Sequence, residues 1–556
     1  MHLIDFINYK KEYEDSIYQE FVNASYKEIK EANLYLPDIV KIIPNISTPT
    51  LKKTMKDKLF NIFKQYGIVA NDGEYCLFIF SEEEKNELIK NDLFWTSFHN
   101  WTVNEKELID RINDISFFSY LIRDIKDIKL KYDLLKRMIE PIKHFSNKQL
   151  IVNLIENQNN NNELYRKLID EYYLYLPQEY KYYLAMNNDS NYLFNKRQKF
   201  IDQDIDIGID PRIKIGPEIE ANRKYSYILN LNSQNGYTNY KVGTDATVPN
   251  GNEIATIVPF QNTTEEIATF CALCEGMTDI GYYYDEEWSN ASGQINLGLD
   301  YLDSAQAILN FYEIFGNCEE LLYYISHEEG QLFRQDVYCN SRIKAISEII
   351  GKRIIEEEIS REQVIKLFNI QYNYDERNIK NLIYKKNSVC LRGSNEYDYR
   401  LEIRIPNGGC NYKTWIDNIR LYGKIMEISK RLADLMHKDY LSEEEQHLLD
   451  LKISLQNNDL SLEEKLVMLM NLLFKDNNIK KIYYNRFISV IKKIKETGAT
   501  NYQKHVNNYE KHFDEVEFIS QYHSRIDPDY TGNGIISFDP VTGEYLENNQ
   551  KRNSIH

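Results

Sequence analysis

The chain has 556 residues, of which 42% are hydrophobic and 27% charged, a composition typical of globular proteins that excludes wholesale disorder. It carries 67 Lys and Arg against 85 Asp and Glu, so its net charge is −18. That acidic excess argues against a protein that coats DNA or RNA, because neutralising phosphates needs a basic surface.

The sequence shows no clear pattern for disulfide bonds, a signal peptide or a membrane span. The seven cysteines are an odd number in a long chain and do not form a disulfide framework. The N-terminal residues lack the apolar stretch of a signal peptide, and no apolar run reaches the length of a membrane span. We therefore expect a cytoplasmic protein with reduced thiols and no membrane partner.

Helical patterns dominate residues 1–200. Apolar residues recur at helical spacing in residues 108–145, and a second helix is expected from Pro49 to Gly67, with capping residues at both ends. This part of the chain is expected to be a helical N-terminal region that recognises a substrate or a partner protein.

Residues 201–430 mix strand and helix patterns. Alternating apolar residues predict strands at 213–220, 226–232, 238–244, 253–258, 293–299 and 399–405. Hydroxyl residues followed three positions later by Glu or Gln predict helix starts at Thr263, Ser360, Ser442 and Ser461.

Residues 431–556 return to a helical pattern and end in an irregular tail. Tyr483, Phe487 and Val490 fall on one face of a helix expected over 481–495. The last thirty or so residues are rich in turn formers and predict a tail or a short hairpin.

The mixed region contains four patterns from which chemistry is expected. In residues 216–220, Glu218 and Glu220 lie two apart and therefore share one face of a strand. Carboxylates that close repel one another, and Mg²⁺ or Mn²⁺ would relieve the repulsion. A solvated strand face is the alternative interpretation.

The second and third patterns add further oxygen ligands. Between Asp245 and Glu253, Gly and Pro predict a turn that brings both carboxylates together, although turn formation alone also explains Asp245. Gln294 and Asn296 alternate with Ile and Leu, so their amides share a strand face. They can ligate a cation, hold a substrate, or pair within the sheet.

The fourth pattern combines charges of both signs. Arg400, Glu402 and Arg404 share one face of a strand. A carboxylate between two guanidinium groups suits a site where metal and phosphoryl oxygens meet. A salt-bridge ladder across strands is the alternative.

In this order, Glu-x-Glu, acidic residue-x7-Glu, Gln-x-Asn and Glu-x-Arg resemble the glutamate–cysteine ligases and amidoligases of the glutamine-synthetase-like carboxylate–amine ligase superfamily. The similarity covers residues 213–425 and includes an amidoligase-like stretch at 330–346. It implies an α+β fold, with a glutamine-synthetase-like antiparallel sheet core backed by helices at 201–430, flanked by helical regions at 1–200 and 431–556.

The resemblance also implies roles for individual residues around ATP and Mg²⁺ or Mn²⁺. Arg404 matches the arginine that faces the transferred phosphoryl group, and Glu402 and Arg404 are the expected catalytic residues. Lys241 and Arg334 are further candidates for phosphate contact. The expected metal ligands form two groups: Glu220, Asp245 and Glu253 in one, and Glu218, Gln294 and Glu402 in the other.

The implied activity is an ATP- and Mg-dependent carboxylate–amine ligase. The γ-phosphoryl group of ATP moves to a carboxylate, and an amine then displaces phosphate to form an amide. Small-molecule or peptide carboxylates and amines are the expected substrates, and the acceptor is an amino acid, a peptide or a protein. Two alternatives remain open: an inactive binding module with the same fold, admitted by Gln294 and Asp245, and a helical interaction scaffold whose carboxylates are only surface charge.

Three further signals have simpler interpretations. Cys271 and Cys274 fit the apolar stripe of an amphipathic helix, since no second cysteine pair completes a zinc site. The basic run at 480–495 fits a solvated helix face, and His327 is expected at the surface.

Overall fold

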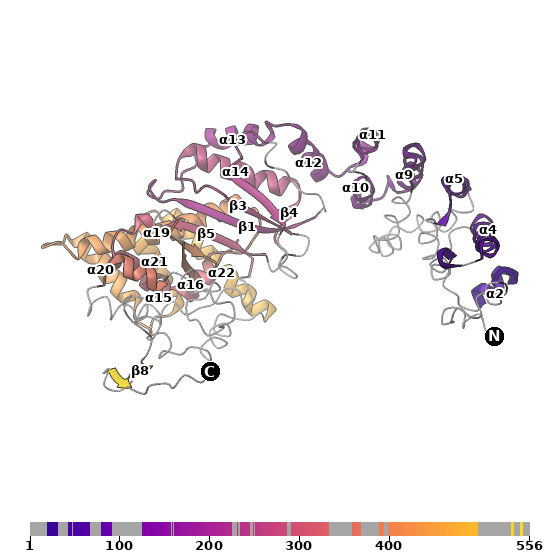
Figure 1. The fold of residues 1–556 in the computed structure, drawn as a ribbon. Helices are drawn as coiled ribbons and strands as arrows, with labels where there is room; N and C mark the ends of the chain where they lie inside the picture. The colour runs from indigo at the N-terminus through magenta and orange to yellow at the C-terminus, as the bar shows by residue number, and fades with distance from the viewer. Residues whose placement is uncertain are drawn as a thin grey trace. The chain divides into compact units, whose positions relative to one another are not determined.

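A computed structural model of the chain describes residues 19, 21–31, 43–46, 48–66, 79–91, 125–156, 158, 161–224, 231, 234–244, 248, 251–285, 291–332, 359–368, 388–393, 398–498, 535–538 and 545–548 (Figure 1). The chain divides into two compact units, Met1–Lys181 and Tyr182–His556. The domain boundaries that the sequence predicts near residues 200 and 430 stay a prediction. None of the helices in the described ranges is long and apolar enough to cross a membrane.

The first unit is helical in its described ranges. Its α-helices lie at α2 (Tyr26–Glu31), α4 (Pro49–Tyr66), α5 (Glu82–Lys90), α9 (Ile128–Ile142), α10 (Gln149–Glu156) and α11 (Asn162–Tyr172). Residues 108–124 of the expected helical stretch lie outside the described residues. Helix α9 begins where the Asp127 side chain accepts from the backbone N–H of Lys129 and Leu130, and it buries an apolar face.

Helix α12 (Gln178–Asn188) continues into the second unit, whose helices include α13 (Tyr192–Asp202), α14 (Thr264–Asp279), α15 (Ala305–Asn317), α16 (Glu319–Ile325), α18 (Arg361–Phe368) and α19 (Tyr412–Leu435). After these come α20 (Glu443–Leu455), α21 (Leu462–Leu473) and α22 (Asn477–Thr497). All four predicted helix starts are confirmed, since Thr263, Ser360, Ser442 and Ser461 each accept a hydrogen bond from the backbone of the residue three positions on.

The second unit contains an open sheet of seven antiparallel strands (Figure 1). Its order is β2 (Tyr240–Thr244), β3 (Gly251–Thr256), β1 (Ile215–Arg223), β5 (Gly293–Gly298), β7 (Arg400–Ile403) and β6 (Val389–Arg392), and β4 (Tyr282–Tyr283) pairs with β1. The predicted α+β class with an antiparallel sheet is therefore confirmed.

Five of the six predicted strands are present, and the sixth, 226–232, falls almost entirely outside the described residues. Strands β4 and β6 were not predicted because two and four residues are too short to show an alternating pattern. In the tail, β8 (Ile535–Phe538) pairs antiparallel with β9 (Tyr545–Asn548), as expected of a short hairpin.

One face of the sheet is apolar and packs against helices. Six of its apolar residues are at most 2% exposed, namely Ile219, Ile254, Ile295, Leu297, Leu401 and Ile403. Gly293 leaves room for α19 on this side, because a Cβ there would lie 2.5 Å from the Trp415 ring. Phe260 bridges to Ile215 and packs on Phe270 of α14, with ring centroids 5.5 Å apart. Each fully buried Ile or Leu contributes about 1.5–3 kcal/mol to folding.

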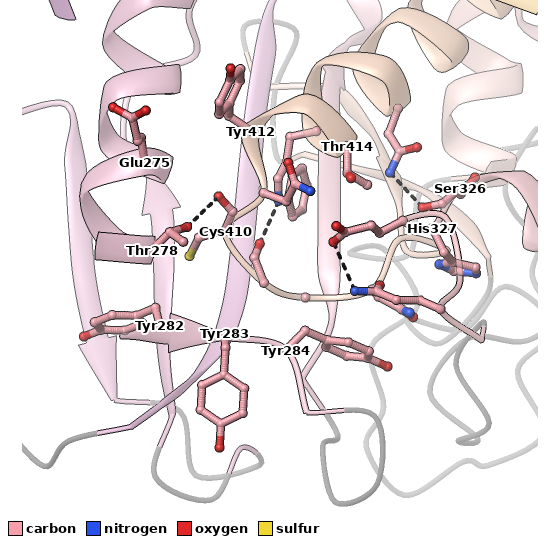
Figure 2. A pocket seen from close by; sticks show the side chains of 18 residues that line it. Glu275, Thr278, Tyr282, Tyr283, Tyr284, Ser326, His327, Cys410, Tyr412 and Thr414 are labelled. Atoms are coloured by element: carbon pink, nitrogen blue, oxygen red, sulfur yellow. Dashed lines mark hydrogen bonds between the residues drawn. The ribbon is translucent and has the colours of Figure 1, made fainter. Parts of the chain in front are cut away.

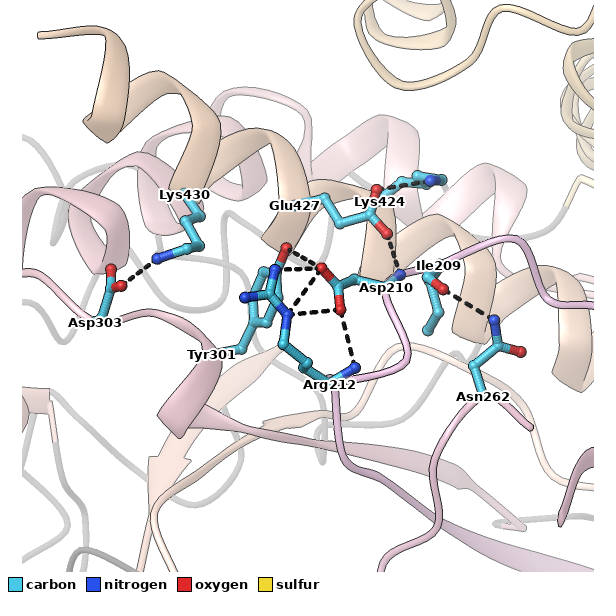
Figure 3. A network of polar contacts seen from close by, with 9 residues as sticks. All are labelled: Ile209, Asp210, Arg212, Asn262, Tyr301, Asp303, Lys424, Glu427 and Lys430. Carbon is cyan, nitrogen blue, oxygen red and sulfur yellow. Dashed lines mark hydrogen bonds and ion pairs between the residues drawn. The ribbon is translucent and has the colours of Figure 1, made fainter.

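The segment that leads into β1 is fastened by a polar network (Figure 3). The Arg212 guanidinium hydrogen-bonds the Asp210 carboxylate and lowers the pKa of Asp210 to about 2. Tyr301 also donates to Asp210, and Glu427 of α19 accepts from the Asp210 backbone N–H. These bonds fix where β1, which carries Glu218 and Glu220, enters the sheet.

Three of the simpler interpretations can be compared with the structure. Cys271 and Cys274 are free and buried in α14, as the apolar stripe predicts. His327 is 1% exposed, so its expected surface position is wrong. Arg486, counted in the basic run of α22, is also buried, because it pairs with Asp417 at 2.6 Å.

Candidate functional site

The face of the sheet opposite the apolar one carries charged and amide side chains from five strands, and we call it the polar face. Residues directly opposite one another in an antiparallel pair project to the same side. Glu218 faces Gln294 across β1 and β5, Glu220 faces Glu253 across β1 and β3, and Asn296 faces Glu402 across β5 and β7. The register therefore brings five of the predicted metal ligands, Glu218, Glu220, Glu253, Gln294 and Glu402, onto one surface.

Glu402 lies at the centre of a buried charge cluster. Its side chain is 0% exposed, and one carboxylate oxygen accepts from Arg404 Nη1 at 2.6 Å. The other oxygen accepts from Arg392 of β6. Arg404 Nη1 also donates to Gln294 Oε1 at 3.1 Å, so the guanidinium group bridges the two strands. The salt-bridge ladder considered for this strand is thus present in the structure.

Glu218 occupies the next row of the polar face. Asn296 Nδ2 donates to Glu218 Oε1 at 3.0 Å, and Asn296 Oδ1 accepts from Arg400 Nε at 3.1 Å. Burial, together with the negative charges of Glu402 and Glu253, raises the pKa of Glu218. The residue is therefore a carboxylate in surroundings that favour its neutral form.

Glu220 is held from two directions. Its Oε2 accepts from the backbone N–H of Ser292 at 2.8 Å, and its backbone oxygen accepts from Gly409 N at 3.0 Å. Gly408 must be a glycine here, because a Cβ would lie 2.0 Å from that backbone oxygen. The loop after β7 is consequently pressed onto β1 at Glu220.

The remaining predicted site residues are less closely grouped. Lys241 lies exposed on β2, and Ala255 of β3 stands between it and Glu218 in the register. Asp245 and Arg334 lie outside the described residues. The structure therefore joins Glu402, Arg404 and Gln294 by direct hydrogen bonds and places Lys241 at the edge of the same sheet.

Sequence reasoning missed one charged member of the polar face, Arg392. It projects from β6 beside Arg400, which it faces across the β6–β7 pair, and it binds Glu402. The only signal was the alternation of Val389 and Leu391 with Cys390 and Arg392, over four residues. Asn296 was noted beside Gln294, but its contact with Glu218 depends on the register of β1 with β5.

The polar face can be tested for its fit to a divalent cation. Carboxylate and amide oxygens are the donors that Mg²⁺ prefers. The raised pKa of Glu218 reflects its burial first and then the negative charges of Glu402 and Glu253, and a cation would offset those charges. Glu402 fits less well, since both its oxygens accept from guanidinium groups. In the described part of the chain, which lacks Asp245, no three His, Cys, Asp or Glu side chains lie close enough together to hold a metal ion.

Comparison with known proteins does not identify a family for this chain. No protein-family model matches the chain, and no curated protein matches it either.

Proposed function

We propose that the protein is an ATP- and Mg²⁺-dependent carboxylate–amine ligase with a glutamine-synthetase-like core. One observation carries the proposal: a single face of an antiparallel sheet presents Glu218, Glu220, Glu253, Gln294 and Glu402 together with Arg404. The same residues were selected from the sequence by their resemblance to this superfamily. A phosphoryl-transfer site needs this combination of oxygen ligands and a fixed guanidinium group.

Each residue of the polar face would have its own role in the reaction. Glu218, Glu220 and Glu253 would hold Mg²⁺, which would neutralise charge on the ATP phosphates, and Gln294 would share its Oε1 between the ion and Arg404. Arg404, fixed by Glu402 and Gln294, would present its guanidinium group to the transferred phosphoryl group. The γ-phosphoryl group passes to the substrate carboxylate and ADP leaves. The amine then attacks the acyl phosphate, an amide bond forms, and phosphate departs.

A second candidate is an inactive module that binds a ligand on the same face. The ion pairs of Glu402 favour this candidate, because both of its carboxylate oxygens already bind arginines. A helical interaction scaffold is the third candidate, and it would bind no nucleotide at this sheet. Localisation in the cytoplasm, protein partners of the helical regions and the absence of nucleic-acid partners stay part of the proposal.

The experiment that tests the proposal measures two quantities on the purified full chain. Calorimetry measures ATP binding with and without Mg²⁺, and a coupled assay measures ADP release with panels of carboxylates and amines. A ligase binds ATP only with Mg²⁺ and releases ADP over many turnovers only when both co-substrates are present. Binding without release indicates the inactive module, and no binding rules out both.

Two variants locate the activity on the polar face. Glu218→Gln removes a proposed metal ligand and is expected to abolish Mg²⁺-dependent ATP binding with the fold retained. Asp300→Asn is the matched control, because Asp300 is an exposed acid of the same unit, 45% exposed and paired with Lys214. Loss of ATP binding in both variants, or in neither, would contradict the assignment.

A further inference from the structure

A separate cavity of about 430 Å³ lies beside the loop that follows β7 (Figure 2). Three parts of the second unit line it: 275–284 from the end of α14 and β4, 326–331 after α16, and 407–418 from the loop into α19. Its volume lies within the range of small-molecule sites, roughly 300–1,000 Å³. None of the charged residues of the polar face lines this cavity.

The walls of the cavity are rich in aromatic rings. Tyr282, Tyr283 and Tyr284 follow one another along one side, and Figure 2 shows Tyr412 on another. Trp415 also lines it. Two of the polar groups are already satisfied, since Trp415 Nε1 donates to Gly409 O and Tyr282 donates to Asn252 Oδ1, each at 2.8 Å. These two bonds fix Trp415 and Tyr282 in the lining, and aromatic rings of this kind attract organic cations.

The charge of the lining is acidic. It includes Glu275 and Glu328, and it includes no Lys or Arg. Lys196 and Lys199 already neutralise Glu275, at 3.2 Å and 3.0 Å. Glu328 forms no ion pair within the described residues, and its carboxylate accepts only from Gln331 Nε2 at 3.2 Å. Glu328 is therefore the lining charge that a cationic ligand would meet.

An independent observation comes from Asn407, whose side chain lines the cavity and is only 6% exposed. Its Nδ2 donates to Leu332 O at 2.8 Å, whereas its buried Oδ1 accepts from no described residue. A buried acceptor left without a donor costs about 1–3 kcal/mol. Because Oδ1 is also closed to solvent, the Asn407 amide has to rotate toward the cavity before the N–H group of a ligand removes that cost.

The loop that lines the cavity also contacts strand β1. Asn407, Gly408 and Gly409 form part of the lining, and Gly409 N donates to the backbone oxygen of Glu220 at 3.0 Å. Arg404 is only three residues before Asn407. The loop that lines the cavity is therefore bonded to the backbone of the strand that carries Glu218 and Glu220.

We propose that this cavity binds the ammonium group of an organic amine, with Glu328 as counter-ion, the aromatic rings as walls, and Asn407 Oδ1 as a hydrogen-bond acceptor once its amide rotates toward the ligand. Naming that amine as the nucleophilic substrate rests on the proposed ligase function, whereas its binding does not. The proposed roles of the sheet residues include none for the amine, and the cavity would provide its binding site.

The test uses the full chain without nucleotide and two probes of equal length, 1,4-diaminobutane and the neutral 1,4-butanediol. Calorimetry is expected to show binding of the diamine and not of the diol. Glu328→Gln should weaken diamine binding at least tenfold, by roughly 1.4 kcal/mol or more. Glu329→Gln is the matched control, because Glu329 is its exposed neighbour and should bind the diamine unchanged.

The outcomes separate this proposal from the ligase proposal. Equal binding of the diol, no binding of the diamine, or equal effects of the two glutamate variants would overturn the amine site, whatever ATP does. Diamine binding that Glu328→Gln alone weakens supports the site. If ADP is then never released in the presence of ATP, Mg²⁺, the carboxylate panel and the amine panel, the ligase proposal fails while the amine site stands. Glu328→Lys, with an unchanged thermal midpoint, should abolish binding and so exclude an effect of misfolding.

Discussion

Replacing Glu402 by Gln tests how strongly the centre of the polar face depends on charge. The side chain of Glu402 is 0% exposed, and its partners Arg404 and Arg392 are 15% and 29% exposed. Gln has almost the same volume and keeps one acceptor oxygen, so packing changes little. The substitution leaves two guanidinium groups without their common counter-ion.

The expected magnitude follows from this burial. Removing one partner of a buried ion pair costs about 3–5 kcal/mol, because the remaining charge is left without compensation. Both arginines keep some contact with solvent, so we expect the lower end, about 3 kcal/mol of unfolding free energy. The control is Asp300→Asn, which breaks a pair of similar length, 2.7 Å, that is 45% exposed on both sides. That change should cost about 0.2–1 kcal/mol.

Hydrogen–deuterium exchange measures the loss of stability of each variant in the sheet itself. Peptides covering β5 and β7 report opening of the sheet, independently of the first unit. For Glu402→Gln, a loss of about 3 kcal/mol corresponds to roughly 100-fold faster exchange, and for Asp300→Asn the increase should stay below about fivefold. Equal exchange in the two variants would refute the reasoning, since it would show that the buried pair is worth no more than a surface pair.

Three further predictions concern other parts of the second unit. Glu218→Gln should raise the thermal midpoint near pH 8, because the raised pKa of Glu218 means that its charged form opposes folding above that pKa. The gain should shrink as the pH falls toward 4.5, and a gain independent of pH would contradict this reasoning. Gly408→Ala should cost about 1–3 kcal/mol in urea unfolding, since its Cβ would meet the Glu220 backbone oxygen, whereas Gly243→Ala, with no atom within 4 Å, should cost far less. Cys271, whose pKa burial raises to about 12, should react with iodoacetamide only after unfolding, and peptide mapping that finds native labelling would disprove its burial.

Local features of the fold followed from the sequence because they depend on near neighbours. The pairs Thr263 with Glu266 and Ser442 with Glu445 lie three residues apart, so a single turn of helix decides whether they form caps. Strand β1 was equally visible, since alternation sends Ile219 and Glu220 to opposite faces. Short strands such as β6 were missed, because four residues carry too little periodicity.

The buried environments of single residues were harder to anticipate. His327 follows a helix and precedes two glutamates, a context typical of the surface, yet it is buried in the lining of the cavity. Arg486 lies in a basic run, but Asp417 of α19 draws it into the core. For Arg486 a residue distant in the chain decides the outcome, and the cavity lining that includes His327 also comes from distant segments. Helical periodicity holds no information about either.

The sequence by itself determined which residue types share a strand face, because side-chain alternation has a period of two: Glu218 with Glu220, Gln294 with Asn296, and Glu402 with Arg404. Only the tertiary structure decided which strands lie next to one another and in what register. That arrangement lets Arg392 bind Glu402 and joins Gln294 to Arg404. The packing of helices and loops gathers the lining of the cavity from segments up to about 140 residues apart. Non-local pairing depends on the packing of the whole apolar face, so no short stretch of sequence encodes it.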